Sequence, residues 1–269
     1  MTRHPDSYRG AGEPVHADVH DARTLPAALK GCRAAYYLVH SLSSKDFRRL
    51  DAEAARAFAR AAADEGVEQI IYLGGLGSDD DTLSAHLSSR REVEGLLGSA
   101  GVPVTVLRAG ILVGSGGISW EITRQLVDHL PAMVTPRWVS TRTQPIAVDD
   151  VVRYLVGVLD RPEALGAVYE VGGPEVMRYA DMLRRVAKIK HRRLLLVPVP
   201  LLSPGLSALW LGLVTDVDSR AGRSLVDSMS NEVVVEDDSI RSVVPFEPMG
   251  YDEAVRQALA DHEAAGAAR

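Results

Sequence analysis

Short apolar runs alternate with helical patterns along the first two thirds of the chain. Runs with the length of buried strands occupy residues 34–40, 67–75 and 102–114. Between the first two runs, apolar side chains recur at helical spacing over residues 45–66. A second helix is predicted over residues 88–101. Strands that are apolar on both faces and separated by helices are typical of a parallel sheet covered on both sides.

The strand–helix alternation ends at about residue 175. Before that point the pattern predicts a helix over residues 149–160 and a strand over residues 167–173, and after it helices over residues 178–189 and 251–265. Asp149 is a candidate N-cap for the first of these helices. We therefore expect a doubly wound α/β domain over residues 1–175 and a small, mostly helical lobe over residues 176–269.

One stretch approaches the length of a membrane span. Residues 194–214, "LLLVPVPLLSPGLSALWLGLV", are nearly free of charge. Pro198, Pro200 and Pro204 fall in its first half, where each removes a backbone donor and disrupts a helix. The stretch therefore predicts a strand, a turn and a short apolar helix, and we expect no membrane insertion.

Charge and cysteine content narrow the class of protein. The formal net charge of the 269 residues is −6, and Lys and Arg are scattered, so we expect no nucleic-acid partner. Cys32 is the single cysteine, which excludes an intrachain disulfide and fits a reducing compartment. The N-terminus has no apolar signal region, so we expect a cytoplasmic protein. The acidic run at 78–81 lacks the spacing of a calcium loop, and we expect no metal.

Ligand-binding residues are expected at the carboxyl ends of the predicted strands, because open α/β sheets bind ligands beyond these ends. These ends read "YYLVHSL", "IIYLGGLG", "VLRAGILVG" and "YEVGG". Together with "TQPIAVDDVVRYL", they resemble the atypical and extended short-chain dehydrogenase/reductases, in particular the NmrA-like branch. The resemblance implies a Rossmann-like fold, NADP or NAD as the cofactor, and a small-molecule substrate.

The resemblance also implies a set of cofactor-binding residues. Its adenosine end falls on Arg3, Asp18 and Val19, and its strand-end and nicotinamide loops fall on Leu38, Val39, His40, Gly74, Gly75, Arg108, Gly110 and Ile111. Each position has a plainer interpretation. Asp18 and Asp21 suit turns and helix caps, His40 suits an exposed strand end, and the glycines suit a close backbone approach.

The catalytic positions depart from the pattern that the resemblance implies. The family's serine position reads Gly74 or Gly75, and its Tyr-x-x-x-Lys motif falls on His86 and Arg90. Histidine can transfer protons near neutral pH, and a cation four residues on lies on the same helical face and lowers its pKa. Arginine cannot exchange protons in this range. The alternatives are a loop histidine and a solvated helix face.

The first residues, "MTRHPDSYRGAGEPVHADVHDA", contain no apolar strand that runs into a glycine-rich turn. The resemblance places "TRHPDSY" just after that unit, so we expect the chain to begin inside its cofactor-binding domain and to bind the cofactor poorly. The strand over residues 34–40 is then left with an unpaired edge, through which the chain could self-associate.

Three functions remain open. The favoured one is an NAD(P)-binding oxidoreductase that acts on a small molecule. The missing serine and tyrosine favour a second, an NAD(P) sensor or assembly factor without turnover. A nucleotide-sugar epimerase or dehydratase is the third, although its chemistry depends on the Tyr-Lys pair that the resemblance leaves unfilled. The segment 133–146, "MVTPRWVSTRTQPI", is either part of a substrate pocket or a loop that docks the lobe.

Overall fold

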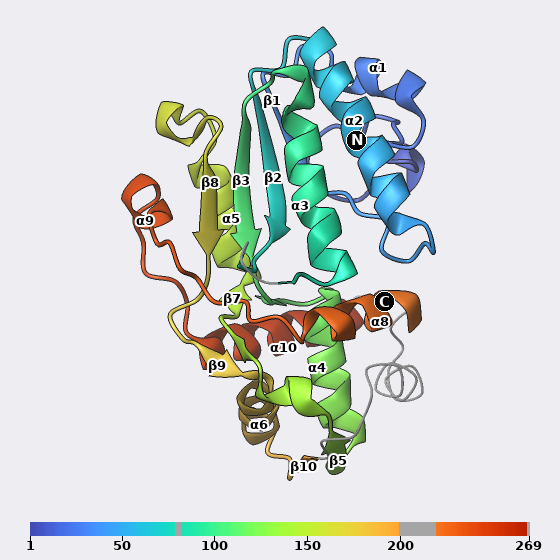
Figure 1. Cartoon of the computed structure of the whole chain (residues 1–269). Helices are drawn as coiled ribbons and strands as arrows, with labels where there is room; N and C mark the ends of the chain where they lie inside the picture. Colours follow the sequence, from blue (N-terminus) through green and yellow to red (C-terminus); the bar gives the residue numbers. More distant parts are fainter. Residues whose placement is uncertain (79–81, 199–218, 268–269) are drawn as a thin grey trace.

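The computed structural model describes residues 1–78, 82–198 and 219–267. Figure 1 shows a sheet flanked by helices, with a mostly helical lobe beneath it. Four parallel strands form the sheet in the order β1-β2-β3-β8. Their bounds are Ala34–Tyr37 for β1, Gln69–Gly75 for β2, Val104–Ala109 for β3 and Val168–Val171 for β8. The predicted parallel α/β sheet is confirmed.

The apolar runs are explained by burial on both faces of the sheet. On one face, Ile70 and Tyr72 of β2 belong to a cluster with α2 (Phe47–Asp64) and α3 (Ala85–Leu97). On the other face, Ile71 packs in a cluster with Tyr154 of α5 (Val148–Gly157). Successive side chains of a strand point to opposite faces, so a strand covered on both sides needs an unbroken apolar run.

Two predicted helix starts are wrong by a few residues. Helix α3 begins at Ala85, not at residue 88, because the hydroxyl of Ser84 accepts the backbone N–H of Leu87 and caps the helix. Asp149 is not an N-cap, since α5 begins at Val148 and Asp149 lies in its first turn, where a carboxylate favours the helix dipole.

Strand β1 lies at the edge of the sheet. It ends at Tyr37, earlier than predicted, and within the described residues it pairs only with β2. Near the N-terminus, Thr2 and His16 form an isolated parallel β-bridge. Its hydrogen bonds join Thr2 N–H to Val15 O at 2.9 Å and Ala17 N–H to Thr2 O at 3.1 Å. The predicted free strand edge is therefore present in the part of the chain that the structure describes.

The lobe is assembled from both sides of residue 175. Its main helices are α4 (Ile118–His129), α6 (Tyr179–Ile189), α8 (Ser219–Ser228) and α10 (Tyr251–Ala267). A single apolar cluster joins Trp120 and Leu126 of α4 to Leu183 of α6 and Val255 of α10. This cluster therefore contains residues from both sides of the predicted boundary at residue 175.

The remaining elements are short. They are α1 (Leu25–Leu29), β4 (Leu112–Val113), β5 (Ala132–Thr135), β6 (Arg142–Thr143), β7 (Ile146–Ala147), β9 (Met177–Arg178), β10 (Leu195–Pro198) and α9 (Ile240–Val243). Strand β10 confirms the strand predicted at the start of residues 194–214, and it runs parallel to β5. The turn and apolar helix predicted after it lie outside the described residues. Within those residues, no helix is both long and apolar enough to cross a membrane.

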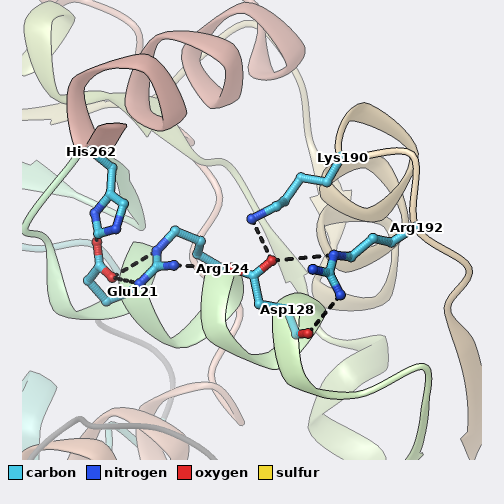
Figure 2. Close-up of polar contacts among 6 residues, drawn as sticks. All are labelled: Glu121, Arg124, Asp128, Lys190, Arg192 and His262. Atoms are coloured by element: carbon cyan, nitrogen blue, oxygen red, sulfur yellow. Dashed lines mark hydrogen bonds and ion pairs between the residues drawn. The ribbon is translucent and has the colours of Figure 1, made fainter. Parts of the chain in front are cut away.

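A partly buried ionic network ties the lobe helices together. Figure 2 shows its six members, Glu121, Arg124, Asp128, Lys190, Arg192 and His262. The guanidinium of Arg124 lies 2.7 Å from a carboxylate oxygen of Glu121 and 3.1 Å from one of Asp128, all on α4. Lys190, just after α6, reaches Asp128 at 2.5 Å, and His262 of α10 lies 3.7 Å from Glu121. The network therefore connects α4 to both neighbouring helices through charge-assisted contacts.

Candidate functional site

A cleft of about 560 Å³ opens beside the end of β1. Five of the predicted cofactor-binding residues line it, namely Arg3, Asp18, Val19, Val39 and His40. Three separate chain segments supply them, so the fold brings together residues that the sequence spreads over almost forty positions. The structure also adds lining residues that sequence reasoning missed, which are Met1, Thr2, Ala17, His20, Ser41, Leu42, Ser43, Ser44 and Leu50.

Local hydrogen bonds shape two walls of this cleft. The carboxylate of Asp18 accepts the backbone N–H of His20 at 2.9 Å, so Asp18 also closes a turn. The Nε2 of His20, beside Asp18, lies 3.3 Å from the hydroxyl of Ser41, which belongs to the segment after β1. The buried carboxylate of Asp51 accepts the backbone N–H of Ser41 at 2.7 Å. Asp18 therefore both stabilises a turn and lines the cleft.

Leu38 is the exception at the end of β1. Its side chain is 53% exposed, and it is not among the described residues that line the cleft. Val39, the next residue, faces the cleft instead.

A second, smaller cavity of about 80 Å³ lies between the ends of β2 and β3 and helix α8. Four predicted residues line it, Gly75, His86, Gly110 and Ile111. Its other described lining residues are Leu76, Leu87, Ala109, Ser119, Tyr179, Leu225, Ser228, Met229 and Val233. The predicted cofactor and catalytic residues are therefore divided between two spaces.

Close packing of α3 on the end of β2 sets one wall of this cavity. A Cβ added at Gly75 would lie 2.8 Å from Cδ2 of Leu87 and 3.8 Å from Cβ of Arg90. A Cβ at Gly74 would lie 3.2 Å from the Tyr72 ring, and Gly74 is not among the lining residues. The plainer interpretation of these glycines, a close approach, therefore agrees with the structure, and it brings His86 to the strand end.

Both ring nitrogens of His86 have partners. Nδ1 lies 3.0 Å from the hydroxyl of Ser228, and Nε of Arg90 donates to Nε2 at 3.4 Å. Because arginine has no acceptor, Nε2 must be the acceptor and Nδ1 carries the proton that is donated to Ser228. Burial, followed by the charge of Arg90, lowers the pKa of His86 to about 3. His86 is therefore neutral near neutral pH.

Arg90 also acts on the cleft. After burial, its charge is the next cause that lowers the pKa of His40, while Asp51 raises it. His40 in turn contributes to the lowered pKa of His86. His40, Arg90 and His86 therefore form one electrostatic group that reaches from the cleft to the cavity, and we call them the bridging group.

Arg108 is held by a carboxylate. Its Nη2 lies 2.7 Å from Oε1 of Glu94 and its Nε 3.2 Å from Oε2, which is a bidentate ion pair between β3 and α3. The two side chains are only 13% and 14% exposed. Gly110 and Ile111, which follow Arg108, reach the cavity wall, whereas Arg108 is not among the described residues that line it.

The segment 133–146 docks neighbouring loops. Arg142 forms an ion pair with Glu232 at 3.1 Å, and the Gln144 amide donates to Gly173 O at 2.7 Å and accepts from the backbone N–H of Val235 at 3.0 Å. These contacts agree with the docking-loop interpretation. Among the described residues, no group of three or more His, Cys, Asp or Glu side chains is arranged to hold a metal ion.

The fold and the two spaces define a cofactor-binding α/β protein. The chain belongs to the NAD(P)H-binding family, whose model matches residues 1–162. The predicted cofactor class, NADP or NAD, is therefore confirmed by the family. No curated protein matches the chain in sequence.

Solved structures share the fold over most of the chain. A nucleoside-diphosphate-sugar epimerase from Staphylococcus aureus is 15% identical with a TM-score of 0.74, and the match covers 94% of this chain and 86% of that one. Triphenylmethane reductase from Citrobacter sp., complexed with NADP(H), is 16% identical (TM-score 0.72; coverage 91% and 83%). The NADPH-dependent quinone oxidoreductase from Escherichia coli, complexed with NADPH, is 19% identical (TM-score 0.72; coverage 92% and 83%). The Rossmann-like fold is thus confirmed.

The residues of the cleft fit one end of such a cofactor. Val19 and Val39 offer apolar surface to a base, Asp18 can accept hydrogen bonds from an amino group or ribose, and the exposed guanidinium of Arg3 suits a phosphate. The volume of about 560 Å³ lies within the range of small-molecule sites. The cleft can therefore hold an adenosine moiety.

Proposed function

We propose that this protein is an NAD(P)H-dependent reductase of a small molecule that carries a carbonyl group. The adenosine end of the cofactor is held by Arg3, Asp18, Val19 and Val39, and the reaction takes place at the cavity lined by His86. The match to the NAD(P)H-binding family over residues 1–162 supports this most directly, together with the five predicted cofactor-binding residues that line the cleft.

The chain's own residues would polarise the substrate. When bound, NAD(P)H supplies a hydride to the carbonyl carbon, and the carbonyl oxygen gains a proton. A neutral His86 can donate its Nδ1–H to that oxygen and stabilise the charge that develops there. Arg90 orients the ring by donating to Nε2. Because the low pKa of His86 leaves its imidazolium form almost unpopulated near neutral pH, water supplies the proton in this scheme.

A cofactor titration combined with turnover tests this function. NADPH binding is followed by quenching of tryptophan fluorescence, and NADPH oxidation is then followed across a panel of small aldehydes and ketones. We expect weak but saturable binding, since the first 33 residues contain no glycine-rich phosphate turn, and slow oxidation with at least one carbonyl. His86→Gln should lower kcat and leave the NADPH Kd unchanged. A chain that binds no NADPH contradicts the proposal.

The second candidate is an NAD(P)-binding sensor or assembly factor. It is favoured by the two glycines at the serine position and by the engagement of both His86 nitrogens with protein partners. Saturable NADPH binding without oxidation by any carbonyl would support it. A nucleotide-sugar epimerase is the third candidate. It is favoured only by the fold that this chain shares with such an enzyme, and conversion of a nucleotide sugar without net NADPH loss would support it.

A further inference from the structure

We propose that the cavity beneath α8 selects an uncharged, largely apolar ligand with a single hydrogen-bond acceptor. The cavity wall formed by Leu225 and Met229 excludes charge, and His86 recognises the acceptor. The proposal rests on the proposed function in one respect, since such a ligand would be the substrate of the reductase.

None of the described residues that line the cavity carries a charge near neutral pH, and the guanidinium of Arg90, which donates to His86 Nε2, lies outside that lining. Of the described residues that line it, only His86 and Tyr179 are titratable. His86 is neutral near neutral pH, as shown above, and burial raises the pKa of the Tyr179 hydroxyl well above its usual value. An anion in this cavity would lose its water shell without gaining a cation along the described wall, which is strongly unfavourable. An apolar molecule gains free energy from the same burial.

The donor of His86 can be transferred to a ligand at little loss. The hydroxyl of Ser228 now accepts from His86 Nδ1, but it also accepts from the Ser84 hydroxyl at 3.1 Å. Ser228 itself donates to the backbone carbonyl of Ser224 at 2.8 Å. Because Ser228 keeps two partners without His86, a carbonyl oxygen in the cavity can take the Nδ1–H and leave no buried polar group unpaired.

The size of the cavity limits the ligand. At about 80 Å³, it has roughly half the volume of a cavity that binds benzene, so a ligand with one small ring enters only if the wall moves outward. Gly75 and Gly110 form part of the floor, and a Cβ at Gly110 would lie 3.3 Å from the Gln144 carbonyl oxygen. The floor therefore has little freedom to move, and enlargement depends on α8.

Three probes with the same number of heavy atoms separate the effect of ligand charge from the effect of a hydrogen-bond acceptor. Acetophenone is uncharged and has one acceptor, cumene is uncharged and has none, and benzoate is charged. Their affinities for the full chain without NADPH are measured by ligand-observed NMR titration at neutral pH. We expect acetophenone to bind at least about tenfold more tightly than benzoate, and about threefold more tightly than cumene. Equal or tighter binding of benzoate overturns the proposal.

A charge on the cavity wall should invert this ranking. In Leu225→Lys, acetophenone should lose at least about tenfold in affinity, while benzoate gains a counter-charge and binds more tightly than in the natural chain. Asp227→Lys adds the same side chain to the same helix at an exposed position away from the cavity, and it should leave both affinities unchanged. If Leu225→Lys does not fold by circular dichroism, Leu225→Gln replaces it and should weaken acetophenone binding severalfold.

The design keeps two failures apart. A chain that ranks the probes as expected but does not bind or oxidise NADPH disproves the proposed function and leaves the ligand class in place. A chain that oxidises NADPH but prefers benzoate, or that responds equally to Leu225→Lys and Asp227→Lys, disproves the ligand class alone.

Discussion

The cleft near the N-terminus and the cavity beneath α8 are built in opposite ways. The cleft is large and open, and charged, histidine and hydroxyl-bearing side chains share its wall with apolar ones. The cavity is small and apolar, and strand ends, a tightly packed helix and α8 enclose it. The difference teaches that substitutions at the cavity should first affect stability, whereas substitutions at the cleft should affect binding and leave the fold intact.

The largest effect is expected behind the cavity wall. Glu94→Gln removes the charge that forms partly buried ion pairs with both Arg108 and Arg91, which should cost about 3 to 5 kcal/mol of unfolding free energy. Urea denaturation measures the loss. The matched control is Glu92→Gln, at an exposed position of the same helix, which should change stability by less than about 0.5 kcal/mol. If Glu94→Gln is stable but binds NADPH differently, Arg108 serves the cofactor instead of the fold.

A smaller loss is expected where α3 meets β2. Gly75→Val places methyl groups where even a Cβ would lie 2.8 Å from Leu87, and it should cost about 2 to 3 kcal/mol. Gly95→Ala, on the exposed side of α3 with nothing within 4 Å of the added Cβ, should instead stabilise the chain by about 0.5 to 1 kcal/mol. Thermal unfolding compares the two. A stable Gly75→Val chain would show that α3 can move away from the strand.

The pH dependence of stability tests the environment of His86. Its pKa is about 3 in the folded chain and near 6.5 when unfolded, so the unfolded chain binds more protons between these values. Stability is therefore complete above about pH 6.5 and falls as the pH falls toward 3. Between pH 7 and pH 5, the natural chain should lose about 1 to 2 kcal/mol more than His86→Gln in urea denaturation. Parallel losses in both chains would place His86 in contact with water.

The smallest effect is expected at the cleft. Arg3→Ala should weaken NADPH binding about two- to fivefold, because an exposed guanidinium near a phosphate contributes up to about 1 kcal/mol. NADH, which lacks the 2′-phosphate, should be affected less. Arg9→Ala removes an exposed guanidinium that does not line the cleft and serves as the control. A fall in melting temperature for Arg3→Ala would erase the contrast between the two spaces.

Sequence reasoning succeeded where the relevant information was local. The apolar run that became β2 is buried on both faces, so its strand and its parallel sheet could be inferred from composition and spacing alone. Asp18 and Val39, which the resemblance assigns to the cofactor, both line the cleft. The family's cofactor class followed from the same motifs, and the family model supports it.

It failed where distant segments meet. Ser228 contacts His86 across 142 positions, and no nearby residue signals that contact. The resemblance placed Arg108 beside the nicotinamide, but Glu94, 14 positions earlier on a helix, binds its guanidinium. The lobe also takes α4 from the first half of the chain, because the apolar face of α4 matches α6 and α10, and such a match is not visible from spacing along one segment.

The ionic network of Figure 2 has a consequence for the order in which the chain acquires its structure during synthesis. Helix α4 leaves the ribosome about 60 residues before Lys190 and more than 120 residues before His262. Until those partners arrive, Glu121 and Asp128 remain hydrated and the apolar face of α4 is uncovered, while the local strand–helix–strand units of the sheet can already form. The sheet domain is thus the natural first product of translation, and the lobe closes only when α10 has been made.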